Sequence, residues 1–399
     1  MLESKPETLQ IREFKLVKDL TQVEELERSC QAGPGGKLSI LTDDLGDPLN
    51  RIRHSQAYVM LVAEKGSEIV GIIRGCIKIV TCGKKLARNP NAVSKPIPVT
   101  TKAAYILGLR VSPSHRRMGV GLALVKKMEE WFEENGVEYV YMATESDNEA
   151  SLNLFTKKCS YSKFRTPCIL VNPVHAHRIR VPNRISIHKL NPAEAETIYR
   201  RRLGTTEFFP RDIDSVLNNN LSLGTFVATP CGYAWPGPEK FLSYPPDSWA
   251  VVSVWNNKEV FKLEVRGASR VLKRLVRATR ALDRVCPWLK IPSVPDFFKP
   301  FGLLLLYGFG GDGPRVNEMV RALCNHSHNF ARESGCGAVV GEVSGHDPIR
   351  LGIPHWKSLS CDEDVWCIKR LGEGYSDGSV GDWTKSPPGI SLFVDPREF

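Results

Sequence analysis

The feature that most constrains the fold of this chain is a basic turn with two glycines, set between an apolar strand and an amphipathic helix. Residues Ala104–Val111 are mostly apolar, and in Gly121–Asn135 apolar residues recur every three or four positions. These patterns predict a strand followed by a helix. The turn between them has the pattern R-x-x-G-x-G, from Arg116 to Gly121. Because glycine has no Cβ, Gly119 and Gly121 allow successive backbone N–H groups to point at one anion. This order of elements predicts an α/β fold with a ligand at the turn.

Positive charge strengthens this prediction. Arg116 and Arg117 lie in the turn, and the following helix adds the positive end of its dipole. From Ile69 to Met128 the chain has no Asp or Glu but twelve Lys or Arg. The whole chain has 54 Lys and Arg against 44 Asp and Glu, a formal net charge of +10. We interpret the turn as a pyrophosphate cradle in a chain whose charge favours an anionic partner.

The same order of predicted elements occurs twice. Residues 9–172 contain a strand, a helix, several strands, the glycine turn, a helix and a strand, and residues 185–371 repeat this order with a glycine turn at Gly308–Gly313. We therefore predict an α/β protein with mixed sheets and two tandem domains. The first covers 9–172, a linker covers 173–184, and a degenerate second copy covers 185–399. An unrelated α+β second domain is the alternative.

Together with Asn148–Phe155, the glycine turn makes residues 9–172 resemble the GNAT superfamily of acetyl-CoA-dependent N-acetyltransferases. Two further stretches, Thr205–Asp214 and Gly381–Pro388, make the whole chain resemble the plant Hookless-type N-acetyltransferase-like proteins. The resemblance implies a GNAT fold and acetyl-CoA bound at the turn. It also implies a nuclear role in the hormone-controlled differential growth of seedlings, connected with ethylene signalling.

The resemblance further implies which residues bind acetyl-CoA. They lie at the end of the strand, in the turn and at the start of a later helix: Leu109, Arg110, Val111, Arg116, Arg117, Met118, Gly119, Val120, Gly121 and Asn148. Coenzyme A carries a pyrophosphate and a ribose phosphate, so the stretch without acids from Ile69 to Met128 would attract it.

Acetyl transfer to an amine requires that the amine lose a proton, so a general base helps. GNAT enzymes often carry a carboxylate on the strand before the turn, but Ala104–Leu109 has none. Our candidate is Glu145, which follows the predicted strand Val137–Ala143 at the edge of the sheet where α/β folds bind ligands. A water molecule is the alternative base.

The thiolate that leaves during the reaction has no evident proton donor. Where GNAT enzymes often have a Tyr in the helix after Asn148, this chain has Phe155. The following segment, Lys157–Tyr161, is one residue longer than is usual in the family and has Ser160 where Gly is common. Tyr161 is therefore a displaced substitute. Because a thiol has a reference pKa near ~8.5, the thiolate can also leave without an acid.

The second glycine turn, Gly308–Gly313, lacks the leading arginine and contains Asp312. A carboxylate at this place repels a pyrophosphate, so we predict that the second copy does not bind coenzyme A. The same residues fit the G-x-G-x-x-G pattern of a dinucleotide-binding unit. However, the acidic residue Glu342 follows about thirty residues later, where ~20 is expected.

A basic amphipathic helix is predicted at 269–285. It would suit a nucleic acid, an anionic lipid or an acidic partner, or it is a surface helix packed on its own domain. His175 and His177, in the linker, are expected at the surface, and no metal site is expected. No apolar run reaches the ~20 residues of a membrane span, and the N-terminus lacks the apolar core of a signal peptide.

Eleven cysteines without C-x-x-C spacing favour reduced thiols in a cytosolic or nuclear protein. Together with the resemblance, this gives an expected nuclear or nucleocytoplasmic location. The observations leave two functions open. The first function is transfer of an acetyl group from acetyl-CoA to a primary amine, with an amine on a protein as one option. The second is a non-catalytic regulator that uses the scaffold to bind acetyl-CoA or only protein partners. Phe155 and the strand without acids favour the regulator, whereas the intact turn favours the enzyme.

Overall fold

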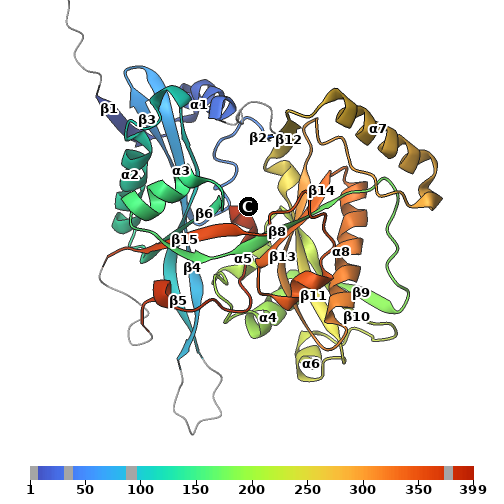
Figure 1. Ribbon diagram of the computed structural model, residues 1–399. Coiled ribbons are helices and arrows are strands. Elements are labelled where there is room, and N and C mark those ends of the chain that lie inside the picture. Colours follow the sequence, from blue (N-terminus) through green and yellow to red (C-terminus); the bar gives the residue numbers. More distant parts are fainter. Residues whose placement is uncertain (1–7, 31–38, 87–96, 373–380) are drawn as a thin grey trace, which may run out of the picture.

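Two β-sheets lie side by side, with helices packed on their faces (Figure 1). The computed structural model describes residues 8–30, 39–86, 97–372 and 381–399. In spatial order, the first sheet contains β1 (Leu9–Glu13), β3 (Ala57–Lys65), β4 (Glu68–Leu86), β5 (Ile97–Val111), β6 (Tyr139–Glu145), β15 (Asp364–Arg370) and β7 (Ser162–Arg165). The second contains β8 (Pro167–Pro173), β14 (Ala338–Ser344), β13 (Leu303–Asp312), β11 (Trp249–Asn256), β10 (Ser222–Pro230) and β9 (Ile185–Leu190). A small ribbon pairs β12 (Lys262–Arg266) with β2 (Ser39–Asp43).

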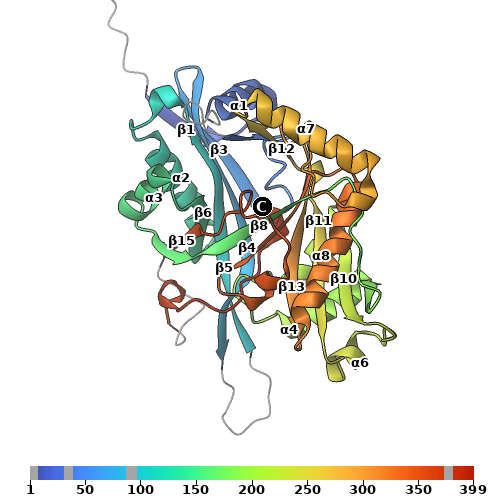
Figure 2. The ribbon, with the colours of Figure 1, turned by 45° about the vertical axis from the view of Figure 1, so that its right-hand side comes forward.

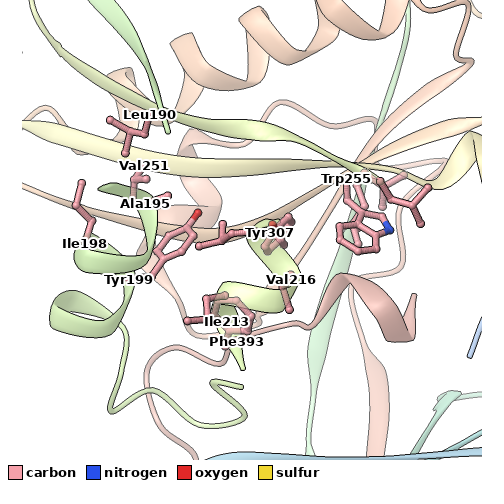
Figure 3. Close-up of a cluster of buried hydrophobic side chains, with 14 of the residues drawn as sticks. Leu190, Ala195, Ile198, Tyr199, Ile213, Val216, Val251, Trp255, Tyr307 and Phe393 are labelled. Carbon is pink, nitrogen blue, oxygen red and sulfur yellow. The ribbon is translucent and has the colours of Figure 1, made fainter. Parts of the chain in front are cut away.

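The helices divide between the faces of the two sheets. They are α1 (Leu16–Cys30), α2 (Val120–Glu134), α3 (Glu149–Leu152), α4 (Pro192–Arg202), α5 (Ile213–Leu217), α6 (Pro238–Ser243), α7 (Arg270–Val285) and α8 (Val316–Glu333). Helix α2 shares one apolar core with the first sheet, and α1 shares the core on the opposite face. Helix α8 covers one face of the second sheet, and α4 and α5 cover the other. Figure 3 shows this last core, in which Tyr199 of α4 and Tyr307 of β13 pack with Phe393 of the C-terminal segment.

The two halves repeat one unit of strand, helix and parallel strand. The unit is β5–α2–β6 in the first half and β13–α8–β14 in the second. In each unit the two strands stop pairing before they end. The last pairs are Ile106 with Met142 and Leu306 with Gly341. The strands therefore open toward the helix that joins them, and the predicted mixed α/β architecture with two related sheets is confirmed.

A bulge explains where each pair of strands opens. In β5, Gly108 and Leu109 together face one residue of β4, and in β13, Gly308 and Phe309 together face one residue of β11. Both glycines lie in the left-handed region, with φ of 63° and 65°, which an L-residue with a Cβ adopts only with strain. One extra residue bends the strand and ends its regular pairing.

The two halves exchange one strand each. β8 belongs to the first half by sequence but pairs with β14 in the second sheet, and β15 belongs to the second half but lies between β6 and β7 in the first. The division of the sheets therefore does not follow the predicted linker at 173–184, because the strand before it and a strand long after it cross over. The two halves are held together by main-chain hydrogen bonds.

The predicted linker is packed against the second half. Val174, His175 and His177 are buried, contrary to the expectation of surface histidines. The Nδ1 atom of His177 lies 2.7 Å from the Oδ1 atom of Asp283 in α7, and the Nδ1 atom of His175 lies 2.8 Å from the Ser293 carbonyl oxygen. These partners are more than a hundred residues away in sequence, so the linker composition alone did not predict the burial.

The two stretches that carry the whole-chain resemblance meet at a buried ion pair. Arg165 of β7 donates two hydrogen bonds to Glu207, of 2.7 and 2.6 Å, and the indole Nε1 of Trp383 donates a third of 2.9 Å. Glu207 lies in the stretch 205–214 and Trp383 in the stretch 381–388, so both stretches join the halves of the molecule.

Candidate active site

The opening between β5 and β6 places the predicted cofactor turn at the wide end of the gap. After Ile106, β5 runs on to Val111 without pairing to β6, and the turn 112–119 then leads into α2. The observed helix Val120–Glu134 agrees with the predicted one. Residues Leu109 and Val111 are partly buried against the core beneath α2, so their backbone follows the edge of the gap.

The turn itself is open and uncapped. Gly119 is the residue before α2 and has φ of 83°, and no side chain caps this end of the helix. A Cβ built on Gly119 would meet no atom within 4 Å. The first turn of α2 contains no acidic residue. The N–H groups of a helix N-terminus bind anions when nothing else satisfies them, and this turn meets that condition.

The basic residues of the turn point to solvent. Arg116, Arg117 and Met118 are exposed, whereas Val120 is buried. Arg116 makes a long hydrogen bond of 3.4 Å to the carbonyl oxygen of Val111, and Arg117 has a positive φ of 66°. Two exposed guanidinium groups beside an uncapped helix fit the phosphates of coenzyme A.

Arg110 is placed differently from the other predicted cofactor residues. Its guanidinium donates to the Leu109 carbonyl oxygen at 3.2 Å. Burial lowers the pKa of Arg110, and the charge of Arg51 lowers it further. Glu27 of α1 and Arg74 are also near, so this side chain lies on the α1 face of the sheet. Only its backbone remains on the edge of the gap.

Asn148 caps the next helix. Its side-chain oxygen accepts a hydrogen bond of 3.2 Å from the N–H of Ser151. Helix α3 then widens into a π-helical segment, η2 (Asn153–Lys158), and Ser160 has a positive φ of 63°. A π-helical turn absorbs one extra residue, which accounts for the longer segment seen in the sequence, and Ser160 adopts the conformation that favours Gly.

Glu145 acquires a carboxylate neighbour that the sequence did not reveal. It is exposed at the end of β6, and its partner across the antiparallel pair with β15 is Asp364. Asp364 is buried, which raises the pKa of its carboxyl to about 6; a backbone hydrogen bond opposes this shift, and Glu145 adds to it. A carboxyl group with a pKa near 6 suits proton transfer near neutral pH.

A third carboxyl group comes from the second sheet. Glu342 lies on β14, just beyond the last pair between β13 and β14. Burial, the charge of Asp364 and the charge of Glu398 raise the pKa of Glu342 to about 8. Perturbed carboxyl groups that gather in one place are typical of functional sites. Glu398 in turn accepts a hydrogen bond of 2.6 Å from the Tyr141 hydroxyl and pairs with Lys78 at 2.7 Å.

Tyr161, the predicted substitute donor, and Phe155, which occupies the family's usual donor position, are both in the core. Phe155 of η2 and Tyr161 are buried, and their rings meet edge to face with centroids 5.1 Å apart. Burial raises the pKa of the Tyr161 hydroxyl well above its usual value, and the charge of Glu129 adds to this. A raised pKa makes Tyr161 a weaker acid, so the structure places no strong proton donor at either residue.

The second glycine turn is closed by the chain itself. Asp312 accepts a hydrogen bond of 2.8 Å from the N–H of Gly313, and Ser248 accepts one of 3.1 Å from the N–H of Arg315. A Cβ on Gly313 would lie 1.9 Å from the carbonyl oxygen of Asp247. Two N–H groups of the loop before α8 are therefore used within the chain. The first turn of α8 has no side-chain cap, as in α2, but it contains the acidic residue Glu318, which α2 lacks.

The opening of the second unit is also filled. The ring of Phe309 lies over Gly341 of β14, where a Cβ would be 3.2 Å from the ring. Leu109 holds the corresponding bulge position in the first half. A large ring against a glycine leaves little space between β13 and β14.

Three further features of the described residues bear on function. No group of three or more His, Cys, Asp and Glu side chains in residues 8–30, 39–86, 97–372 and 381–399 is arranged to hold a metal ion. Within these same ranges, each helix is too short or too polar to cross a bilayer. Asp364 was missed in the sequence, and Glu342 was considered only as the acidic residue of a dinucleotide-binding pattern, because the arrangement of the strands, rather than local spacing, brings them to the site.

Comparisons with family models, with curated proteins and with solved structures show what the chain is similar to. The family model for the acetyltransferase (GNAT) family matches residues 21–161. The chain is 63% identical to "Probable N-acetyltransferase HLS1" of Arabidopsis thaliana, over 98% of this chain and 99% of that protein. It is 41% identical to "Acetyl transferase GW6a" of Oryza sativa subsp. japonica, over 98% and 97%. Among solved structures, N-myristoyltransferase of Saccharomyces cerevisiae with bound myristoyl-CoA shares the fold at 9% identity, with a TM-score of 0.51 over 92% of this chain and 80% of that one.

Proposed function

The chain belongs to the GNAT acetyltransferase family, and from this premise we propose that it transfers the acetyl group of acetyl-CoA to a primary amine. The observation that carries the proposal is the open turn at Gly119, which joins an uncapped helix to the gap between β5 and β6. The N–H groups of the first turn of α2, with Arg116 and Arg117, would hold the pyrophosphate. The backbone of Leu109 and Val111 would orient the rest of the molecule along the gap, and Asn148 stands at the start of the neighbouring helix.

In the proposed reaction, the amine nitrogen attacks the thioester carbonyl carbon, a C–N bond forms and the C–S bond breaks. The amine proton passes to a carboxylate, and coenzyme A leaves as the thiolate. We assign the proton to the pair Glu145–Asp364, with Asp364 as acceptor because burial raises its pKa to about 6. Glu145, the residue expected from the sequence, acts through its charge on Asp364. Tyr161 is buried, so in this proposal the thiolate leaves without a proton from Tyr161.

Two variants test the proton acceptor. Asp364→Asn should lower kcat/KM for an amine substrate by ~10²-fold or more and leave acetyl-CoA affinity unchanged. Glu145→Gln removes a repelling charge, so the acidic limb of the pH profile should move below the wild-type midpoint near 6. Asp362→Asn, a matched change at an exposed neighbour, should behave as wild type. If Glu145→Gln lost activity at every pH while Asp364→Asn stayed active, Glu145 would be the proton acceptor instead of Asp364.

A second function is favoured by one specific observation. Phe155 and Tyr161 are both buried in the core, so neither of these two residues supplies a proton to the leaving thiolate. A regulator that binds acetyl-CoA without turnover would tolerate this arrangement. Radiolabelled acetyl-CoA, offered with peptide and polyamine amines, separates the two functions. Labelled product supports the transferase, and saturable binding with no product in any arm supports the regulator.

We propose a biological role on the basis of the resemblance of the sequence to the Hookless-type proteins. That resemblance implies a role in hormone-controlled differential growth, connected with ethylene signalling, and a nuclear location. Expression of the chain in a seedling that lacks its own protein of this type should restore differential growth. A fluorescent fusion that is excluded from nuclei while it restores growth would contradict the nuclear location.

A further inference from the structure

A cavity with strongly basic walls lies far from the acetyl-CoA turn, between α7 and the end of α8. It has a volume of about 850 Å³, within the ~300–1,000 Å³ that is typical of small-molecule sites. Its walls carry seven basic side chains and one acidic side chain: Lys258, Lys262, Arg277, Arg280, Arg284, Lys299, Arg332 and Asp296. Figure 2 shows α7 and α8 next to each other in the second half of the molecule.

The chain neutralises few of these charges. Arg277 pairs with Asp296 at 3.1 Å, and Lys258 donates to the carbonyl oxygen of Ser334 at 2.9 Å. Arg280 donates to the carbonyl oxygen of Val174 and to Ser293 Oγ, and Arg332 lies 4.0 Å from Glu333. Within the described residues, no ion pair or hydrogen bond is made by the side chains of Lys262, Arg284 and Lys299. These three cations, with their partnered neighbours around the same cavity, repel one another unless an anion joins them.

Two arginine side chains of the cavity, those of Arg280 and Arg332, are in unfavourable surroundings. Burial lowers the pKa of Arg280, the like charges of Arg284 and Arg332 lower it further, and the charge of Asp283 opposes the shift. The Nε–H of Arg332 is shielded from solvent and has no acceptor among the described residues. A buried donor without an acceptor costs free energy, and a bound anion would remove this cost.

The walls also limit the kind of anion. One aromatic ring, that of Phe301, lines the cavity. It is tilted by 38° against Phe297, with centroids 4.5 Å apart, and it packs against Gly337. These contacts occupy part of the one ring that lines the described walls, so a nucleotide base has little surface on which to stack. Arginine guanidinium groups and lysines bind phosphate groups well. In a cavity without a free aromatic surface, they favour a polyol that carries phosphates over a nucleotide.

We propose that this cavity binds a small polyol that carries several phosphate groups. The proposal is independent of acetyl transfer, because the walls come from α7, α8 and residues 295–302 rather than from the open turn. The same phosphate chemistry could reach the cavity as a free inositol polyphosphate or as the headgroup of a membrane lipid. The geometry of α7 favours the free molecule.

The argument for the free molecule comes from the two faces of α7. Arg277, Arg280 and Arg284 line the cavity at a spacing of three and four residues, on one face of the helix. The exposed apolar side chains Val271, Leu275, Leu282 and Val285 form a stripe on the opposite face. A lipid whose headgroup filled the cavity could not lay its chains against that stripe.

Isothermal titration of the full chain with inositol hexakisphosphate tests the site, in the presence of saturating acetyl-CoA. We expect one equivalent to bind. Arg284→Glu and Lys299→Glu should each weaken binding at least tenfold, since neither side chain holds the described structure together. Arg274→Glu makes the same charge change at an exposed position of α7 outside the cavity and should change affinity less than twofold.

Each other outcome overturns a stated part of the proposal. If Arg284→Glu and Arg274→Glu weakened binding equally, the probe would be attracted to the basic helix in general, and the cavity would not be its binding site. Absence of saturable binding would exclude polyol phosphates as the ligand class. Displacement of the probe by acetyl-CoA would show that the probe binds at the acetyl-CoA turn. Vesicles containing phosphatidylinositol 4,5-bisphosphate are the second arm. Binding to them that is tighter than to the soluble probe, and lost in Leu275→Ser, would make the source a membrane.

Discussion

At the scale of single residues, the two glycines of the open turn have different roles. Gly119 adopts φ of 83°, where any other residue is strained, so it shapes the turn. Gly121 has a helical backbone, and a Cβ on it would make contacts of 3.4 and 3.6 Å with Leu154 and Val111, within ordinary packing distance. The fold therefore tolerates a small side chain at 121, and we propose that the glycine leaves room for the approach of a ligand.

Gly121→Val should reduce affinity for acetyl-CoA at least tenfold, which is about 1.4 kcal/mol. The branched side chain would hold phosphate oxygens away from the N–H groups of α2. Titration calorimetry measures the effect, with Gly121→Ala as the smaller change and Lys127→Ala as a control for charge on the same helix. Wild-type affinity in a folded Gly121→Val protein would show that the turn does not hold the cofactor.

Glu342 should make the stability of the protein depend on pH. Its pKa is about 8 in the folded protein, against 4.5 for the ordinary group. Between these values the folded protein keeps a proton that the unfolded chain has lost, so this group lowers stability as pH rises, by up to ~1.4 kcal/mol per pH unit. In urea unfolding, Glu342→Gln should gain stability relative to wild type from pH 5 to pH 8.5. Parallel pH curves for the two proteins would exclude the raised pKa.

At the scale of secondary-structure elements, buried polar contacts hold remote segments together. The pair Arg165–Glu207 joins β7 to the segment before α5, and Trp383 adds a third segment to the same carboxylate. Both charged side chains are nearly inaccessible, with exposed fractions of 4% and 6%. Removal of one partner leaves the other charge buried and unpaired.

Glu207→Ala should therefore lower the free energy of unfolding by about 3–5 kcal/mol. Glu239→Ala breaks a pair with Arg201 that is exposed on both sides, and it should change stability by less than about 0.5 kcal/mol. Denaturant unfolding of both variants gives the comparison. Similar small losses in the two variants would mean that the Glu207 contacts do not join the segments.

The sequence predicted those elements whose signals are local. The strand Ala104–Val111, the glycine turn and the following helix appear in the structure because apolar periodicity and glycine placement act over a few residues. The longer segment before Tyr161 was also visible, and the π-helical turn accounts for it. The bulge at Gly108 was not visible, because it depends on the register between β4 and β5.

At the scale of the whole molecule, the exchange of β8 and β15 was beyond sequence periodicity. The apolar pattern of both segments predicts strands, but it does not show which sheet each strand joins. The pairing of Asp364 with Glu145, and with it the carboxyl pair of the candidate site, depends on this exchange. The buried histidines of the linker are another case, since their partners lie on α7 and α8.

The exchange predicts that neither half folds without the other. A fragment of residues 1–183 lacks β15, whose Val365, Trp366, Cys367 and Ile368 are buried in the two cores of the first sheet. A fragment of residues 184–399 lacks β8. Each alone should show little cooperative unfolding by circular dichroism, and co-expression should restore a stable 1:1 complex that binds acetyl-CoA. Cooperative folding of the 1–183 fragment alone would contradict the exchange.

The central claim is a division of labour between two related units, of which one binds acetyl-CoA. The first turn is open at Gly119, and the second is closed by Asp312, Ser248 and the ring of Phe309. Isothermal titration of the full chain with acetyl-CoA tests this most directly through its stoichiometry. The account predicts one equivalent per chain, and no binding when Arg116→Ala is combined with Gly121→Val. Two equivalents per chain, or one equivalent that survives the double change, would contradict it.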